Sequence, residues 1–214
     1  MPRQINLDIA LISKFYITSD TSDRKSKIEA RKQAIYQYRN DVLTQYLGEP
    51  IQNCHFNQNE FGKPFLKDYP NFSFNHSHSN EMYALASSDK IKDLGVDVED
   101  LNRKVRFDAL AQHAFHSDEY QRWQALENDP IYWFKVWTTK EAILKAHGMG
   151  IRMDLKDLNT NIHQTQNGGM TFHEKLGTFA FQNYEIADAL ITVAWRSEQS
   201  CRGFALPMIK IIQH

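Results

Sequence analysis

The sequence predicts a mixed α/β (α+β) protein with two lobes, each a small, mainly antiparallel sheet packed against a long helix. Apolar residues recur at helical spacing in residues 25–47 and 131–150, and short runs rich in β-branched and aromatic residues read as strands. The runs M-Y-A-L-A-S at 82–87 and L-I-T-V-A-W at 190–195 give both halves a similar plan. We therefore expect an N-terminal lobe of residues 1–103 and a C-terminal lobe of residues 104–214.

The composition excludes several classes of protein. Of 214 residues, 42% are apolar and 24% are charged, and the net charge is -1. This balance is unlike that of disordered chains or general nucleic-acid binders. No apolar run reaches the roughly 20 residues of a membrane span, and residues 1–17 do not resemble a secretory signal, so we expect a cytoplasmic protein. Cys54 and Cys201 lack the spacing of a zinc site or a disulfide framework.

The N-terminal half reads as a strand, a helix and three further strands. A strand at 5–18 precedes a helix at 25–47, which ends at Gly48 and has a basic polar side. A loop-like segment at 51–70 contains the turn F-G-K-P. Strands then follow at 72–79, 82–87 and 91–100, the first two joined by a tight connection at Asn80.

The strand at 91–100 carries two carboxylates on one face. Asp97 and Glu99 are two residues apart, while Val96 and Val98 point the other way, into the core. Adjacent like charges repel, and a bound cation removes that conflict. Two carboxylates, a third one and water suit Mg²⁺, which also keeps room for a substrate phosphate. The alternative is an acidic strand end that faces water.

The C-terminal half reads as helices followed by strands. Residues 107–115 are helical, His116 to Glu119 form a capping box for a further helix, and Asp129-Pro130 ends it. After the long helix, residues 153–169 are a polar connection. Short strands of an antiparallel sheet are expected at 170–172, 179–181, 184–187, 189–196 and 205–212.

The helix at 131–150 is apolar nearly all round in its first turns, which indicates burial between two layers. Gly148 and Gly150 mark its end. Glu141 and Lys145 share a face, whereas Lys140 points about 100° away. The alternative is an ordinary surface pair of Glu141 and Lys145.

Five motifs occur in a fixed order across residues 61–145. They are F-G-K-P at 61–64, F-N-H-S-H-S at 74–79, G-V-D-V-E at 95–99, A-F-H-S-D-E-Y at 114–120 and W-T-T-K-E-A-I-L-K at 137–145. Each is weak alone, but together they resemble the Sfp-type phosphopantetheinyl transferases, the carrier protein holo-synthases.

The resemblance implies a fold of two pseudo-symmetric lobes with coenzyme A and Mg²⁺, or Mn²⁺, in the cleft between them. It implies transfer of the 4'-phosphopantetheine arm to a serine of an acyl or peptidyl carrier protein, which is generally acidic, with release of adenosine 3',5'-bisphosphate. Two lobes in one chain suggest a monomer. Neither the carrier nor its pathway, whether fatty acid, polyketide or nonribosomal peptide synthesis, follows from the sequence.

The resemblance also assigns roles at the metal and the reacting phosphate. Asp97 and Glu141 are expected to bind the metal, and Glu99 to bind it directly or through water. Glu141 is also the candidate general base for the serine hydroxyl. Lys145 is expected to hold the pyrophosphate and stabilise the leaving phosphate.

The remaining assignments concern the coenzyme. By resemblance, Ser77 and His78 contact the 3'-phosphate, Lys63 lies on the nucleotide side, and Lys140 lies near phosphate. For His78 the alternative is a sheet histidine with a backbone partner.

The chain departs from the family pattern at His76, where many relatives have Ile or Leu, and at Asn80, where many have Gly. Arg31 and Arg39 are both candidates for the phosphate-binding arginine of the N-terminal helix, and neither falls cleanly in register.

Two other functions compete with the transferase. His76 and His78 share a strand face and, with Asp97 and Glu99, suit a metal-dependent hydrolase. A non-catalytic module that binds coenzyme A or a carrier protein is the second. Retention of Asp97, Glu141 and Lys145 argues against that module, because binding alone does not require carboxylates beside a phosphate.

Overall fold

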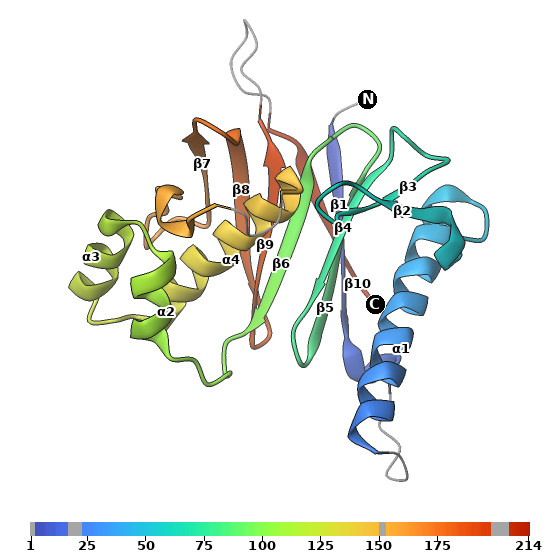
Figure 1. Ribbon diagram of the computed structural model, residues 1–214, viewed down its shortest axis with the longest axis horizontal. Coiled ribbons are helices and arrows are strands. Elements are labelled where there is room, and N and C mark those ends of the chain that lie inside the picture. Colours follow the sequence, from blue (N-terminus) through green and yellow to red (C-terminus); the bar gives the residue numbers. More distant parts are fainter. Residues whose placement is uncertain (1–2, 17–22, 150–152, 198–205) are drawn as a thin grey trace, which may run out of the picture.

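The computed structural model describes residues 3–16, 23–149, 153–197 and 206–214. Figure 1 shows its layers: helix α1 (Arg24–Leu47), a first sheet, a second sheet, and helix α4 (Pro130–His147) with two shorter helices packed against it. The mixed α/β class predicted from the sequence is confirmed.

The first sheet has the strand order β10-β1-β5-β4. Its strands are β1 (Gln4–Leu11), β4 (Ser73–His78), β5 (Met82–Ser88) and β10 (Met208–Gln213). The expected strand at 5–18 is shorter, because a 3-10 helix at Ile12–Lys14 follows β1 and residues 17–18 lie outside the described residues.

The predicted place of residues 205–212 among the antiparallel C-terminal strands is wrong. The described part of this segment forms β10, which pairs with β1 of the first sheet in parallel, with Gln4 opposite Met208. Residue 205 lies outside the described residues. Alternating hydrophobicity indicates a strand but does not name its partner, which tertiary packing decides.

The second sheet is antiparallel, with the order β6-β9-β8-β7. Its strands are β6 (Leu94–Asp100), β7 (Gly168–His173), β8 (Gly177–Ile186) and β9 (Ala189–Arg196). The two strands expected at 179–181 and 184–187 are one strand, β8. The pairing crosses the predicted division at residues 103 and 104, since β6 joins the second sheet and β10 the first.

The helices begin and end where local signals indicate. Asp23 caps α1 through the backbone N–H groups of Lys25 and Ser26, and Gly48 ends it with φ 77°. The capping box at His116 and Glu119 is confirmed. The shorter elements are α2 (Phe107–Ala114), α3 (Ser117–Ala125), β2 (Phe56–Gln58), β3 (Pro64–Leu66) and 3-10 turns at Asn53–His55 and Leu155–Asp157.

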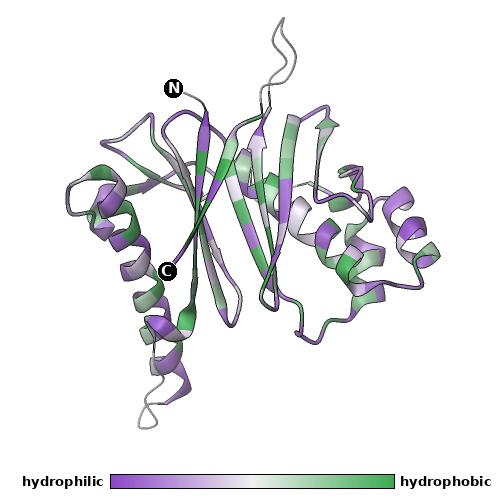
Figure 2. Ribbon diagram, turned by 180° about the vertical axis from the view of Figure 1, so that it is seen from behind, coloured by the Kyte–Doolittle hydropathy of each residue, from purple (hydrophilic) through white to green (hydrophobic). Residues whose placement is uncertain are grey.

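Helix α4 ends at His147, with Gly148 at φ 85° as its C-cap, whereas the predicted helix extended to residue 150, which lies outside the described residues. Its Trp133, Phe134 and Val136 are fully buried against the second sheet, α2 and α3, so the predicted burial between two layers is confirmed. Two further cores lie between the sheets and between the first sheet and α1. Figure 2 shows hydrophobic stretches along the central strands of both sheets. In the described part of the chain, no helix has the length and apolarity to cross a bilayer.

Gly95 permits the close crossing of α4 over β6. A Cβ atom at this position would lie 2.1 Å from the carbonyl oxygen of Ala142 and 2.4 Å from the backbone nitrogen of Ala146. Such distances are far below van der Waals contact, so any larger residue would push the helix away from the strand. The glycine of G-V-D-V-E therefore brings Glu141 and Lys145 of α4 next to the carboxylates of β6.

Candidate active site

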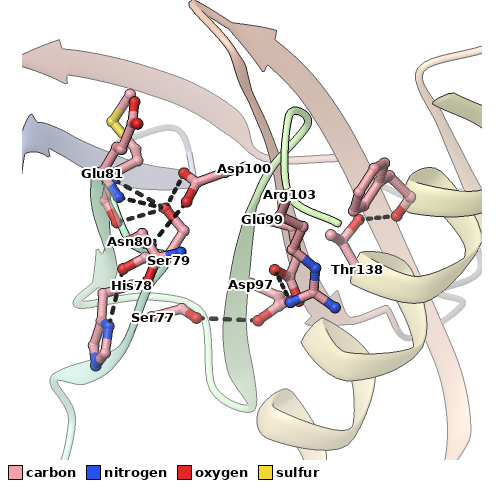
Figure 3. Close-up of polar contacts among 12 residues, drawn as sticks. Ser77, His78, Ser79, Asn80, Glu81, Asp97, Glu99, Asp100, Arg103 and Thr138 are labelled. Atoms are coloured by element: carbon pink, nitrogen blue, oxygen red, sulfur yellow. Dashed lines mark hydrogen bonds and ion pairs between the residues drawn. The ribbon is translucent and has the colours of Figure 1, made fainter. Parts of the chain in front are cut away.

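The candidate site lies where the two sheets meet. Strands β4 and β6 are edge strands of the first and second sheet, and side chains connect them. The backbone N–H of Val96 donates to Asn75 Oδ1 at 2.9 Å, and the Ser77 hydroxyl donates to Asp97 Oδ1 at 3.0 Å. Figure 3 shows Ser77 and Asp97 pointing toward one another from β4 and β6. We call this junction the β4–β6 seam.

Helix α4 adds Lys145 to the seam. Its ammonium donates to Asp97 Oδ1 at 2.6 Å and to Ser77 Oγ at 2.9 Å. The Asp97 side chain is 7% exposed and that of Lys145 is 31% exposed, so the ion pair is open to solvent on one side only. Three residues chosen from the sequence thus meet from three separate elements.

The other two predicted carboxylates are close enough to interact with Asp97. Burial, and then the charge of Asp97, raise the pKa of Glu99 to about 7, although Arg103 opposes the rise with its Nη1 atom 2.6 Å from Glu99 Oε2. Burial, and then Asp97, also raise the pKa of Glu141, while Lys145 lowers it. Asp97 thus repels both Glu99 and Glu141, an arrangement that costs free energy and that a cation relieves.

The donor set fits a hard divalent cation. Asp97 Oδ2 is buried and accepts no hydrogen bond from a described residue, so it keeps its lone pairs for a metal. Among the described residues, however, no group of three or more His, Cys, Asp or Glu side chains is gathered into a metal site. Asp97 and Glu99 are instead paired with Lys145 and Arg103, and a metal would compete with both ion pairs.

A cavity of about 330 Å³ opens beside the seam. Asp97, Glu99 and Ser77 line it together with the basic side chains of Arg31, His78, Arg103 and Lys145. Basic side chains around a polar cavity suit an anionic group such as a phosphate. The exposed His78 has its Nδ1 atom 3.3 Å from the carbonyl oxygen of Ser79. The backbone partner that the alternative interpretation of His78 requires is therefore also present.

Two residues fix the connection between β4 and β5. Arg31 Nη2 donates to the carbonyl oxygens of Ser79 and Asn80, both at 2.8 Å. Asp100 accepts from the backbone N–H of Asn80 at 2.8 Å and from the Ser79 hydroxyl. Arg31, whose role the sequence left open, therefore holds this turn and also lines the cavity.

The expectation that Lys140 lies near phosphate is corrected. Its side chain is 1% exposed, forms an ion pair with Glu119 at 2.8 Å, and donates to the carbonyl oxygens of Leu155 and Leu158. The 100° between Lys140 and Glu141 turns Lys140 toward α3, away from β6.

Lys63 and Arg39 are likewise engaged within the protein. Lys63 Nζ donates to the carbonyl oxygens of Leu94 at 3.0 Å and Ala146 at 2.6 Å. The buried Arg39 lies over the rings of Tyr36 and Phe56 and donates to the side chains of Asn40 and Asn53.

His76 lies on the face of β4 opposite to Ser77. Its ring is 6.4 Å from that of Tyr36 on α1 and 5.8 Å from that of Tyr83. Burial lowers the pKa of His76 to about 3, so the ring is neutral. His76 therefore packs against Tyr36 and Tyr83 on the face of β4 opposite to the Ser77–Asp97 contact, which does not favour the hydrolase alternative.

The sequence assigned no individual role to Gly95, Asn75, Asp100 or Arg103, although Gly95 and Asn75 lie within two of the five motifs. A basic residue in the turn just after an acidic strand was the available signal for Arg103. The contacts of Asn75 and Asp100 depend on how the two sheets pack against each other. No local sequence pattern predicts that packing.

Comparison with known proteins supports the sequence resemblance. Residues 93–194 match the family model described as the 4'-phosphopantetheinyl transferase superfamily. The chain is 29% identical over 150 residues to a 4'-phosphopantetheinyl transferase of Bacillus pumilus, covering 69% of this chain and 63% of that one. It is 35% identical over 127 residues to one of Aneurinibacillus migulanus, covering 58% and 51%.

A 4'-phosphopantetheinyl transferase of Bacillus subtilis strain 168 is 26% identical over 133 residues, which cover 61% of this chain and 58% of that one. The matches thus span about half to two thirds of the length of these three relatives. Residues 93–194 include β6 and α4, which carry Asp97, Glu99, Glu141 and Lys145. On these matches, the chain is similar to members of the 4'-phosphopantetheinyl transferase superfamily, over a part of the chain that includes β6 and α4.

Proposed function

We propose that this protein transfers the 4'-phosphopantetheine arm of coenzyme A to a serine hydroxyl of an apo carrier protein and releases adenosine 3',5'-bisphosphate. The observation that carries the proposal is the contact of Lys145 with Asp97 and Ser77, beside two carboxyl groups whose pKa values are raised. These residues belong to three of the five motifs that the chain shares with the family.

Asp97, Glu99 and Glu141 would hold Mg²⁺ or Mn²⁺. When bound, the metal supplies positive charge against the coenzyme pyrophosphate. Two observations support this assignment: the buried Oδ2 atom of Asp97 has no hydrogen bond from a described residue, and Asp97 repels both Glu99 and Glu141.

In the transfer step, the serine oxygen forms a bond to the β-phosphorus of coenzyme A, and the bond between that phosphorus and the bridging oxygen breaks. Glu141 accepts the serine proton, directly or through water, and its raised pKa makes it a better base than an ordinary carboxylate. The ammonium of Lys145 stabilises the charge that develops on the departing phosphate.

Ser77 and His78 are proposed to contact the 3'-phosphate. Both line the cavity, as do the cations Arg31 and Arg103. The partner is proposed to be an acidic acyl or peptidyl carrier protein, and the enzyme a cytoplasmic monomer.

Mass spectrometry tests the proposal directly. The protein is incubated with coenzyme A, Mg²⁺ and each of several apo carrier proteins, with EDTA as the control for metal dependence. A mass gain of one phosphopantetheine arm on the carrier serine is expected only with Mg²⁺ or Mn²⁺. No gain on any carrier would contradict transfer, and binding of coenzyme A without transfer would favour the non-catalytic module.

A further inference from the structure

The side chain of Lys63 connects the two elements that carry the candidate site. Lys63 belongs to the F-G-K-P turn just before β3. Its ammonium donates to the carbonyl oxygen of Leu94, the first residue of β6, at 3.0 Å. It also donates to the carbonyl oxygen of Ala146, in the last turn of α4, at 2.6 Å. One cation therefore bridges strand and helix.

The helix end favours such a cation. Ala146 contributes one of the last four carbonyl groups of α4, which have no partner within the helix. These groups carry the negative end of the helix dipole, which attracts a positive charge. Burial lowers the pKa of Lys63 to about 8, and the nearby Asp93 opposes this effect. The two carbonyl groups thus replace much of the water that the ammonium has lost.

The loop around Lys63 is shaped to the end of α4. Asn59 Nδ2 donates to the carbonyl oxygen of Gly148 at 3.2 Å, and Asn59 Oδ1 accepts from the backbone N–H of Lys63 at 2.8 Å. A Cβ atom at Gly148 would lie 2.9 Å from Asn59 Nδ2 and 3.0 Å from Lys63 Cδ. The lysine is therefore held in place by its own loop and by the helix cap.

Both bridged carbonyl groups lie next to the crossing of α4 over β6. Gly95, where the helix backbone comes closest to the strand, directly follows Leu94, and Ala146 is one of the residues it approaches. Asp97 is three residues after Leu94, and Lys145 directly precedes Ala146. A shift at the crossing would therefore move Asp97 relative to Lys145 and Glu141.

We infer that Lys63 is a positioning residue: by bridging Leu94 and Ala146 it fixes the crossing of α4 over β6, and so the geometry in which Asp97 and Glu141 meet a divalent cation. This inference rests on the proposed function, since it concerns the same carboxylates. In this role the lysine of the F-G-K-P motif binds backbone carbonyl groups of the protein instead of the coenzyme.

The test measures the affinity of the full chain for Mn²⁺ in the absence of coenzyme. Electron paramagnetic resonance reports the concentration of the free ion. Lys63→Met removes both hydrogen bonds and keeps most of the side-chain volume. We expect Mn²⁺ binding roughly 10-fold weaker than in the wild type, in the range found when groups supporting metal ligands are removed. Lys63→Arg keeps a cationic donor and should restore most of this loss.

Lys135→Met is the matched control. Lys135 is also a buried lysine of α4, but its ammonium donates to Gln164, Gln166 and Asn167, on the far side from β6. Its removal should lower the thermal unfolding midpoint while Mn²⁺ binding stays within about twofold, since no metal-ligand support is lost. If Lys63→Met does not fold, Lys63→Gln, which keeps a neutral donor, takes its place. We then expect Mn²⁺ binding to weaken by a smaller factor.

Two results would overturn the inference. The first is unchanged Mn²⁺ binding in folded Lys63→Met, and the second is an equal loss in Lys63→Met and Lys135→Met. If the first result comes with a higher KM for coenzyme A, Lys63 is a direct coenzyme contact.

Failure of the proposed function has a different signature. If the wild type binds Mn²⁺ but modifies no carrier, transfer is contradicted while the effect of Lys63→Met on Mn²⁺ binding still decides the inference. If Asp97→Asn binds Mn²⁺ as tightly as the wild type, the metal assignment itself fails, and the role of Lys63 fails with it.

Discussion

The ammonium of Lys145 lies 2.6 Å from Asp97 Oδ1, which joins helix α4 to strand β6 at the edge of a basic cavity. The pair is partly shielded from water, so its interaction is stronger than that of a typical surface ion pair. A lysine held at a fixed place beside the cavity can meet a developing negative charge without reorganising.

Lys145→Met should therefore lower kcat/KM for carrier modification strongly. Loss of one such donor costs roughly 2 to 4 kcal/mol of transition-state stabilisation. Lys156→Met, at an exposed lysine, is the control and should leave the rate unchanged. A rate within threefold of the wild type in Lys145→Met would show that this ammonium does not act on the reacting phosphate.

His78→Ala tests the proposed contact with the 3'-phosphate. Because His78 lines the cavity at the end of β4, its loss should raise KM for coenzyme A more than KM for dephospho-coenzyme A. Steady-state kinetics with both substrates measure the two ratios. Equal ratios would argue that His78 has only a structural role.

Gly95→Ala should destabilise the protein and reduce its activity. The added Cβ would lie 2.1 Å from the carbonyl oxygen of Ala142, so the backbone of α4 or β6 must move, at a cost of about 3 kcal/mol or more. Urea unfolding measures the loss. Lys156→Ala, at an exposed residue, is the control for a substitution without a clash. Similar losses in both variants would mean that the crossing is not close-packed.

His76 should make the fold sensitive to acid. Its pKa is lowered to about 3 in the folded protein, whereas an unfolded histidine titrates near 6.5. Between these values the unfolded chain binds a proton that the folded chain does not, so stability falls as pH drops from about 6.5 toward 3.

Replacing this residue, as in His76→Gln, should remove up to about 1.4 kcal/mol per pH unit from that dependence. Urea unfolding between pH 7 and pH 4.5 measures the slope, and His163→Gln, at an exposed histidine, is the control. Parallel slopes for His76→Gln and the wild type would contradict a neutral, half-buried ring.

Local signals predicted most elements of the fold but not how they pair. The glycines at 48 and 148 and the apolar spacing along α1 and α4 placed these helices to within a few residues. The parallel pairing of β10 with β1 had no such signal, because it depends on contacts between opposite ends of the chain.

The candidate site, like the fold, was predicted only in part from the sequence. The resemblance chose Ser77, Asp97 and Lys145, and these residues meet in the structure. Lys140 was misplaced, because its partner Glu119 lies on α3, which the sequence did not connect with it. The pairing of Glu99 with Arg103 depends on the turn after β6, whose geometry no strand pattern specifies.

The central claim is that carboxylates of β6 and α4 share one divalent cation, and Mn²⁺ binding to Asp97→Asn and Glu141→Gln tests it most directly. Both variants should bind Mn²⁺ at least 10-fold more weakly than the wild type and lose nearly all turnover, in line with the loss of metal ligands or their supporting groups. Asp157→Asn, at an exposed carboxylate, is the control and should change neither the Mn²⁺ affinity nor the turnover. Wild-type Mn²⁺ affinity in either Asp97→Asn or Glu141→Gln would contradict the shared site.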